Sequence, residues 1–485
     1  YAQTHYHEQP NGISIRLYDS YPSLYMQFSK EAEFVAAPDW YYNVEYIKEK
    51  NRGYECHEDL YTPGIFEVKM KEGDSLVFSA ATFQGIPSTF KNRFKREVNK
   101  RISRDSFLGC LKNTANQFIQ YIGDTAVDII AGYPWYNSIS RETFIALPGL
   151  KLAQTERRLA LEVLSTYLPH LNKGLFPMSI GANLPLYNSA DASLWFIWCL
   201  QQLKKQGSRF REFGPPFYSA MKEILENYRK GTRIVTMMED GLLFAAEQGV
   251  ALTWMDSYSH GAPVVPRYGK PVELNALWYN AVCYGLEMAR NEKDEEFIAD
   301  WKLMPEMIGE AFLKAFWSEE KKYLADVENG LFTDWSVRPN MVIAAAMPYT
   351  PMTKDQREKI LGVARNQLLT PRGLRSLSPD DPAYKESVQG DPHQREAAIH
   401  NGAAFPWLIQ FFAEAFLNVY NNKEIPFLKK LVLGFESEMT ENCIGSISEM
   451  YNGTPPQLGK GAISQAWNVA ALLYTQQLIS EKESE

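Results

Sequence analysis

The chain has 485 residues, of which 45% are hydrophobic and 22% charged, and it carries a formal net charge of -8 with a pI near 5.6. This length and composition predict a soluble globular protein with a large core and more than one domain. The acidic balance provides no general positive field, so it argues against nucleic acid and membrane surfaces as partners and favours a neutral substrate.

The cysteines and the apolar segments indicate in which cellular compartment the protein is expected. Five cysteines are scattered without a CxxC pair, which is typical of reduced thiols and predicts a cytoplasmic protein. No apolar run approaches the roughly 20 residues that span a bilayer, and the first residues do not form a signal peptide. The chain begins with Tyr1 rather than Met, so we expect preceding residues to be missing.

The segment up to about residue 88 has a period-two pattern that predicts β-sheet. Its apolar positions are Ile13, Ile15 and Leu17, then Phe66, Val68 and Met70. A basic stretch follows at residues 91–104, with apolar residues too sparse for a core helix. We interpret residues 89–106 as a solvated linker helix, which is favoured over a nucleic-acid patch.

Residues 107–485 are predicted to be helical, with two kinds of helix. Segments that are apolar on nearly all sides, and therefore buried, begin near Glu142, Ala190, Val272, Pro339, Gly402 and Ala462. Amphipathic segments begin near Gln154, Pro216, Asp294, Lys354 and Glu424, and residues 105–123 supply a sixth.

This alternation is typical of an (α/α)6 toroid, in which six inner helices are ringed by six outer ones. A helical solenoid would also alternate, but it should show a sequence repeat, and we find none. The predicted fold is therefore mainly α, a toroid at 107–485 preceded by part of a β-sandwich domain at 1–88.

The loops before the inner helices are rich in aromatic, amide and charged residues. If every inner helix points its N-terminus to the same end of the toroid, these loops converge on one polar crater, as in an active site. The high aromatic content, 13% of the chain, fits sugar binding because sugar rings stack on aromatic faces, although a large aromatic core explains it equally well.

Hydrolysis of a glycosidic bond needs one carboxylic acid and one carboxylate. Trp254 is close enough in sequence to desolvate Asp256 and raise its pKa, as a general acid requires, and Glu449 precedes a turn-rich loop where it can face a cavity. A capping or turn aspartate and a surface glutamate remain alternatives for these two. The other carboxylates of the loops are Glu142, Asp191, Glu273, Asp380, Asp381, Asp391 and Glu396.

A set of short stretches from about residue 130 onward resembles the C-terminal glucosidase part of glycogen debranching enzymes, the amylo-α-1,6-glucosidases of glycoside hydrolase family 133. The stretches are Ala131 to Tyr136, Arg141 with Thr143 to Leu150, Tyr187 to Phe196, Asp240 to Leu242, Leu252 to Asp256, Pro266 to Glu273, Gly373 to Leu377, Gly390 to Pro392, His400 to Gly402, Phe405 to Trp407, and Gly461 to Trp467. The β-region resembles the end of that family's β-sandwich domain.

The resemblance implies an inverting enzyme that releases glucose from α-1,6 branch stubs of glycogen or a related α-glucan, with Asp256 as general acid and Glu449 as general base. It also implies a glucose subsite formed by Trp135, Arg141, Tyr187, Asp191, Trp254, Arg267, Lys270, Gln465 and Trp467. Within this set, Tyr187 and Asp191 can also be a turn and an N-cap, Arg267 and Lys270 can simply pair with acids, and Trp467 can be core.

One departure affects the expected subsite. The family usually has Trp-Gly-Arg-Asp-Thr where this chain has Ile139-Ser140-Arg141-Glu142-Thr143. We therefore expect Glu142 to contact the sugar, and we expect the substrate range or activity of this protein to differ from that of a true debranching enzyme.

Two other functions stay open. One is another inverting glucosidase on the same toroid, similar to a glucoamylase or trehalase, and the other is an α-glucan-binding protein that has lost catalysis. No metal or cofactor is expected, because the seven histidines show no HExxH or comparable spacing and no Gly-rich phosphate loop is present.

Overall fold

The computed structural model describes residues 2–123, 126–153, 158–181, 184–207, 210–245, 247 and 249–484, without the side chains of 210–213. It divides into two compact units, Tyr1–Ile102 and Ser103–Glu485. Gln154, the expected start of one amphipathic helix, lies outside the described residues.

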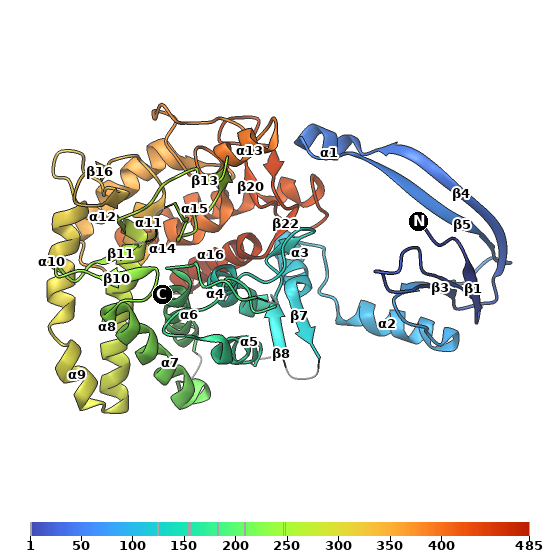
Figure 1. Ribbon diagram of the computed structural model, residues 1–485, viewed down its shortest axis with the longest axis horizontal. Coiled ribbons are helices and arrows are strands. Elements are labelled where there is room, and N and C mark those ends of the chain that lie inside the picture. The colour runs from blue at the N-terminus through green and yellow to red at the C-terminus, as the bar shows by residue number, and fades with distance from the viewer. Residues whose placement is uncertain are drawn as a thin grey trace. The chain divides into compact units, whose positions relative to one another are not determined.

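The first unit contains an antiparallel sheet and a long ribbon. The sheet has the order β1-β2-β3-β6, formed by β1 (Tyr6–Gln9), β2 (Gly12–Ile15), β3 (Leu24–Phe28) and β6 (Phe78–Ala81). The ribbon pairs β4 (Glu33–Glu45) with β5 (His57–Glu67), and Figure 1 shows it as a curved hairpin that ends in α1 (Ile47–Arg52). Phe66 of β5 packs against Phe28 of β3 with ring centroids 5.0 Å apart, which joins the ribbon to the sheet.

The strands of this unit extend less far than the period-two pattern suggests. Leu17 lies beyond the end of β2, and Val68 and Met70 lie beyond the end of β5. Most residues of the β4–β5 ribbon are exposed on both faces, so no alternation of apolar residues marks its true extent. In the basic stretch, η1 (Pro87–Thr89) leads into α2 (Phe90–Lys100), which buries Phe90 alone.

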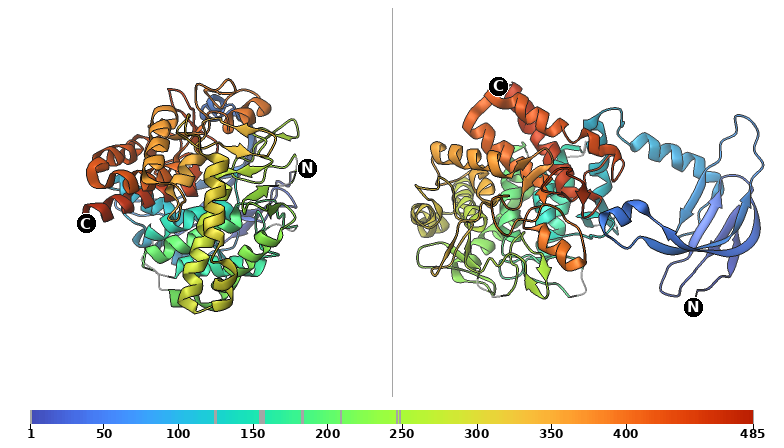
Figure 2. Two further views of the ribbon diagram at one scale, coloured as in Figure 1. Left: turned by 90° about the vertical axis from the view of Figure 1, so that its left-hand side faces the viewer. Right: turned by 90° about the horizontal axis from the view of Figure 1, so that it is seen from above.

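The second unit is mainly helical, and among its described residues six helices are buried along most of their length. They are α4 (Ser140–Leu150), α6 (Ala192–Lys205), α8 (Val272–Glu292), α11 (Asn340–Ala346), α14 (Ile409–Tyr420) and α16 (Ala466–Ser484). Each packs against the next, and α16 packs against α4, so the contacts close into a ring. The first and last of these helices therefore lie side by side (Figure 1 and Figure 2).

Other helices of this unit bury one side and expose the other, as the alternation in the sequence predicts. They are α3 (Phe107–Ala115), α5 (Leu159–Tyr167), α7 (Phe210–Lys230), α9 (Glu295–Trp301), α10 (Met304–Phe316), α12 (Lys354–Val363) and α15 (Ile425–Leu433). Most pack on a buried helix next to them in the chain, for example α7 on α8 and α15 on α16.

Short strands order the long segments between these helices. They are β7 (Ile119–Ile122), β8 (Ala126–Ile129), β9 (Gly132–Tyr133), β10 (Val235–Met237), β11 (Leu243–Ala245), β12 (Tyr258–Ser259), β13 (Ala262–Pro263), β14 (Lys270–Pro271), β15 (Val327–Glu328), β16 (Thr333–Asp334), β17 (Leu369–Thr370), β18 (Gly373–Arg375), β19 (Ala404–Phe405), β20 (Met450–Tyr451), β21 (Gly459–Lys460) and β22 (Ser464–Gln465). One sheet, with the order β17-β18-β19-β20-β21, links the segments before α14 and α16.

Two features differ from the helix boundaries expected from sequence. The fifth buried helix, expected near Gly402, begins at Ile409, because residues 404–405 pair as β19 with β18 and β20. The long loop before it contains a further helix, α13 (Pro392–Ile399). Asp391 and Gln394 form a capping box at its start. This pattern is visible in the sequence, although the segment was expected to be a loop.

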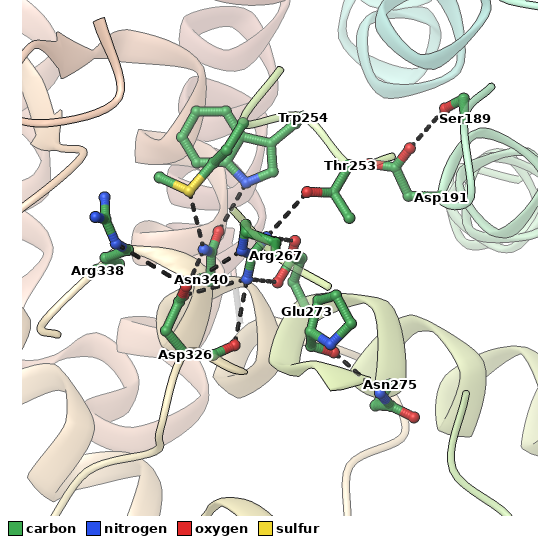
Figure 3. A network of polar contacts seen from close by, with 12 residues as sticks. Ser189, Asp191, Thr253, Trp254, Arg267, Glu273, Asn275, Asp326, Arg338 and Asn340 are labelled. Atoms are coloured by element: carbon green, nitrogen blue, oxygen red, sulfur yellow. Dashed lines mark hydrogen bonds and ion pairs between the residues drawn. The ribbon is translucent and has the colours of Figure 1, made fainter. Parts of the chain in front are cut away.

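A buried ionic network holds the segment before Asp256 in place (Figure 3). The guanidinium of Arg267 donates to both carboxylate oxygens of Glu273, at the start of α8, and to Asp326 at 3.2 Å. It also donates to Thr253 Oγ1 at 3.0 Å.

The same network anchors the next two residues through Asn340 of α11. The Nε1 of Trp254 donates to Asn340 Oδ1 at 2.7 Å, and Asn340 Nδ2 contacts the Met255 sulfur at 3.4 Å and donates to Asp326 at 2.7 Å. Three consecutive residues before Asp256 are thus fixed by one polar cluster.

A helix that crosses a bilayer must be both long and apolar. None of the described helices combines the necessary length with sufficient apolar character.

Replacing Arg267 tests how far the fold depends on this network. We expect Arg267→Met to lower the free energy of unfolding by about 3–5 kcal/mol, because it leaves Glu273 and Asp326 buried without their counter-charge. Urea denaturation measures the change. The matched control is Arg233→Met, which breaks an exposed ion pair with Glu247 and should cost about 1 kcal/mol or less. Equal losses in the two variants would contradict the structural role.

Candidate active site

A pocket of about 350 Å³ lies among the segments that precede the buried helices of the second unit. Its lining comes from the segments before α4, α6, α8, α14 and α16, so the convergence that the sequence predicts is confirmed. The volume is that of a small-molecule site. The lining residues are Tyr136, Ile139, Arg141, Glu142, Met178, Asn188, Ser189, Ala192, Ala251, Trp254, Asp256, Ser257, Tyr258, Glu396, Ile399, His400, Phe405, Glu449 and Trp467.

Arg141, in the first turn of α4, lines the pocket. Its Nε donates to Asp191 Oδ1 at 2.8 Å and its Nη2 to Ser189 Oγ at 3.0 Å. Asp191 is fully buried and caps no backbone N–H of α6, so its carboxylate serves the guanidinium instead. The remaining nitrogen, Nη1, donates to Asp256 Oδ2 at 2.8 Å.

Asp256 is ionised in this arrangement. Burial on its own would raise the pKa of Asp256, but the neighbouring His400 and the Arg141 guanidinium outweigh burial and hold the pKa below its ordinary value. His400 Nε2 lies 3.9 Å from Asp256 Oδ1. The expectation that desolvation by Trp254 raises the pKa of Asp256 is therefore wrong.

Trp254 instead forms part of the aromatic floor. It is 2% exposed, and its ring packs edge to face on Phe405 and on Trp407, with centroids 5.4 and 5.1 Å away. Trp407 in turn stacks on Trp467 at 4.6 Å. Trp254, Phe405 and Trp467 line the pocket and give it an apolar surface on which a sugar ring can stack.

Glu449 stands on the segment between α15 and α16, just before β20. Its Oε2 accepts a hydrogen bond from the backbone N–H of Ala462 at 2.7 Å, and the hydroxyl of Tyr136 lies 3.2 Å from both carboxylate oxygens. Burial raises the pKa of Glu449 to about 7, and the charges of Glu396 and Asp256 add to this rise against the opposing effect of these two donors. At neutral pH this carboxyl is close to half ionised.

Glu142 is a third carboxyl of the pocket, next to Arg141 in sequence. Its Oε2 accepts from Gln465 Nε2 at 2.7 Å. Burial raises its pKa to about 8, and the charges of Glu449 and Asp256 contribute in the same direction. The side chain is therefore largely protonated at neutral pH, which makes it a hydrogen-bond donor to any hydroxyl in the pocket.

The structure brings together six of the twelve side chains expected at the site, and all six line the pocket: Arg141, Glu142, Trp254, Asp256, Glu449 and Trp467. Two more, Asp191 and Gln465, stand behind them and hold Arg141 and Glu142.

The other four lie outside the pocket lining. Trp135 is 46% exposed, and Tyr187 donates to the carbonyl of His170 at 3.3 Å. Arg267 belongs to the buried network beneath the Asp256 segment. Lys270 pairs with Asp240 at 2.8 Å and with Glu328 at 3.2 Å, the acid pairing that the sequence left open for it.

Three pocket residues whose side chains can donate or accept protons were not expected at the site from the sequence. Tyr136 follows Trp135 in an aromatic loop, and only the course of the backbone decides which ring faces Glu449. His400 lies within a stretch that resembles the family, without a spacing typical of ligands or catalytic histidines. Glu396 was one carboxylate among several, and the capping box of α13 is the signal that would have placed it on a helix.

The described residues contain one group of possible metal ligands within 4.8 Å of one another, Glu45, Cys56 and His57 of the first unit. The ammonium of Lys50 already donates to Glu45 at 2.6 Å. We assign no function to this exposed group.

Comparison with known protein families gives matches to both parts of the chain. A family model described as amylo-alpha-1,6-glucosidase matches residues 113–474, and one described as glycogen debranching enzyme N terminal matches residues 1–77. The resemblance identified from the sequence motifs is thereby confirmed.

Two individual proteins are similar to the chain. A curated protein of Saccharomyces cerevisiae named glycogen debranching enzyme is 21% identical over 462 residues, which cover 72% of this chain and 30% of that protein. The chain thus spans less than a third of that relative. The crystal structure of an uncharacterized conserved protein from Thermus thermophilus matches with a TM-score of 0.54 at 12% identity, over 75% of this chain and 99% of that one. At this identity the match shows a shared fold alone.

The protonation of Glu142 has a testable consequence for stability. Because its pKa in the folded protein, about 8, exceeds the value near 4.3 of an unfolded chain, stability falls as pH rises between these values, by about 1.4 kcal/mol for each unit of difference. We expect Glu142→Gln to remove this fall, so that the variant gains stability relative to the wild type from pH 5 to pH 9. Urea denaturation at several pH values measures the difference.

The matched control is Glu162→Gln, at an exposed position of α5. It should show no such dependence on pH. A difference between Glu142→Gln and the wild type that stays constant with pH would show that Glu142 ionises normally in the folded protein.

Proposed function

We propose that this chain, which belongs to the amylo-alpha-1,6-glucosidase family, is an inverting glycoside hydrolase that releases glucose from α-1,6 branch stubs of glycogen or a related α-glucan. The observation that carries the proposal is the pocket that Asp256 and Glu449 share with an arginine and an aromatic floor. Because its volume is about 350 Å³, the pocket suits a terminal sugar rather than the middle of a chain.

The same proposal includes the architecture. The ring of six buried helices and the half-exposed helices around it support an (α/α)6 toroid over 107–485. The match to the N-terminal family model supports reading residues 1–88 as the last part of a β-sandwich domain, with 89–106 as the connecting helix.

In the proposed mechanism Glu449 is the general base. Ala462 and Tyr136 hold its carboxylate, and a pKa of about 7 makes it a better proton acceptor than an ordinary glutamate. It removes a proton from a water that attacks the anomeric carbon on the side opposite the leaving oxygen. The glucose that first forms is then the β-anomer.

Asp256 is the proposed general acid, and it must gain a proton that it lacks in the free protein. Arg141 is anchored by Asp191 and Ser189 through two of its nitrogens, which leaves Nη1 as the contact that substrate can replace. When a sugar hydroxyl accepts from Nη1, Asp256 loses its counter-charge, and the bound sugar excludes water from a side chain that is 39% exposed in the free protein. Its pKa then rises, so the proton becomes available on the bound substrate.

The protonated Glu142 and the rings of Trp254 and Trp467 complete the proposed glucose subsite. The protonated Glu142 donates a hydrogen bond to a sugar hydroxyl. The aspartate that the family usually has at this position would, when ionised, accept a hydrogen bond from that hydroxyl instead. The α-glucan is the proposed partner of the chain.

The two roles predict different losses on different substrates. On a phosphorylase limit dextrin trimmed to single α-1,6 glucosyl stubs, we expect Asp256→Asn and Glu449→Gln each to lower glucose release at least about 100-fold. On α-glucosyl fluoride, whose leaving group needs no proton, Asp256→Asn should remain active and Glu449→Gln should not. NMR identifies the anomer first formed.

Asp240→Asn, which alters an acid outside the pocket lining, should keep wild-type rates on both substrates. The reverse pattern on the fluoride would make Glu449 the acid and Asp256 the base. The charge states of the free protein, taken alone, favour this exchanged assignment. Faster release from linear maltooligosaccharide than from the stubs would favour a glucoamylase-like enzyme. Binding of the dextrin without turnover would favour a binding protein in which Arg141 keeps Asp256 ionised.

A further inference from the structure

One wall of the pocket is formed by helix α13 and the β12–β13 hairpin. Glu396, Ile399 and His400 face the pocket from α13, at the spacing that puts three side chains on one side of a helix. Tyr258, two residues after Asp256, faces it from the hairpin. This wall is therefore continuous in sequence and in space with the proposed acid.

The opposite side of the same wall borders a second, open cleft of about 710 Å³. Ser259 faces this cleft, as the alternation of a β-strand requires when Tyr258 faces the pocket. The rings of His260 and His393 stack at 3.9 Å and hold the hairpin against the helix. Most side chains around the cleft are hydroxyls, amides and imidazoles, groups that exchange hydrogen bonds with sugar hydroxyls.

Glu396 is the carboxylate on the pocket side of this wall. It is half-buried and forms no hydrogen bond or ion pair within the described part of the chain, in contrast to Asp256 and Glu449. Burial raises its pKa, the charge of Asp256 acts in the same direction, and the charge of the neighbouring Arg395 opposes these effects without outweighing them. A desolvated carboxylate without a partner is costly unless a ligand supplies donors to it.

The chemistry of the reaction says which part of a substrate lies here. A general acid protonates the oxygen that joins the departing sugar, so the departing sugar lies on the side of the acid. With Asp256 as the acid, this side is the wall of α13 and the hairpin.

We propose that this wall binds the departing glucan, with Glu396 accepting hydrogen bonds from hydroxyls of its first glucose and the outer cleft taking the chain beyond. The inference rests on the proposed function, because it uses Asp256 as the acid. According to this proposal, Glu396 makes the enzyme prefer substrates whose leaving group is a glucan. It takes no part in the chemistry on the glucose that is released.

The test compares two substrates that both need an acid and differ in the leaving group. The stub dextrin releases a glucan, and methyl α-glucoside releases methanol. We expect Glu396→Gln to lower kcat/KM on the dextrin about 10- to 100-fold, the range for losing hydrogen bonds to a charged group. On methyl α-glucoside, with each form of the enzyme measured at its own pH optimum, the variant should stay within about twofold of the wild type, although it lacks one of the charges that raise the pKa of Glu449.

The matched control is Glu386→Gln, which removes the same charge ten residues away at an exposed position outside both linings. It should leave both substrates unaffected. Equal losses of Glu396→Gln on the two substrates would show that Glu396 acts through the charges of Asp256 and Glu449 and would overturn the proposal.

A binding measurement separates failure of this inference from failure of the proposed function. If the wild type released no glucose from either substrate, the proposed function would fail, yet calorimetric titration with maltotriose, which stands for the departing chain, would still decide the inference. Weaker maltotriose binding in Glu396→Gln, with glucose binding unchanged, would support it. Equal maltotriose binding in the variant and the wild type would overturn it.

Discussion

The buried guanidinium of Arg267 is the constraint on which the site depends. It joins the start of α8 to Asp326 beside β15, and it reaches across to Thr253 in the segment before Asp256. A buried arginine is costly unless its donors are satisfied, so these partners hold one another in a single arrangement. Through Asn340 the same arrangement fixes Trp254, and the backbone enters the pocket at Asp256 in a defined direction.

Arg141 plays the corresponding part inside the pocket, where the balance is different. Asp191 and Ser189 anchor it, while its contact with Asp256 is at the pocket surface. Three further carboxyls, Glu142, Glu396 and Glu449, line the same pocket, and burial together with the charge of Asp256 raises the pKa of each. At neutral pH the free site therefore holds a proton on Glu142, a partly protonated Glu449 and a negative charge on Asp256. Substrate hydroxyls can donate and accept hydrogen bonds, so a bound substrate can change which of these carboxyls carries a proton.

The departure from the family motif also acquires a physical description. Ile139 lines the pocket where the family usually has tryptophan, and Glu142 accepts a hydrogen bond from Gln465. The Oε1 of Gln465 is buried and has no hydrogen-bond partner among the residues that the structure describes. A protonated carboxyl beside an unsatisfied amide oxygen has room to rearrange its hydrogen bonds when a sugar enters. The longer side chain and the smaller neighbour thus change the same part of the lining.

The sequence by itself determined the helical architecture and the segments that form the site, because burial on all sides and burial on one side leave different apolar patterns along a helix. Its motifs also selected Asp256 and Glu449, which the fold brings into one pocket. Tertiary structure alone decided the rest. Lys270 and Arg267 share a motif, yet one pairs near the surface and the other is buried, since the partners Asp240 and Asp326 are distant in sequence. Trp254 precedes Asp256, yet Arg141 and His400 set the charge of that carboxyl, because electrostatic interactions depend on distance in space and the neighbours in sequence are turned toward other partners.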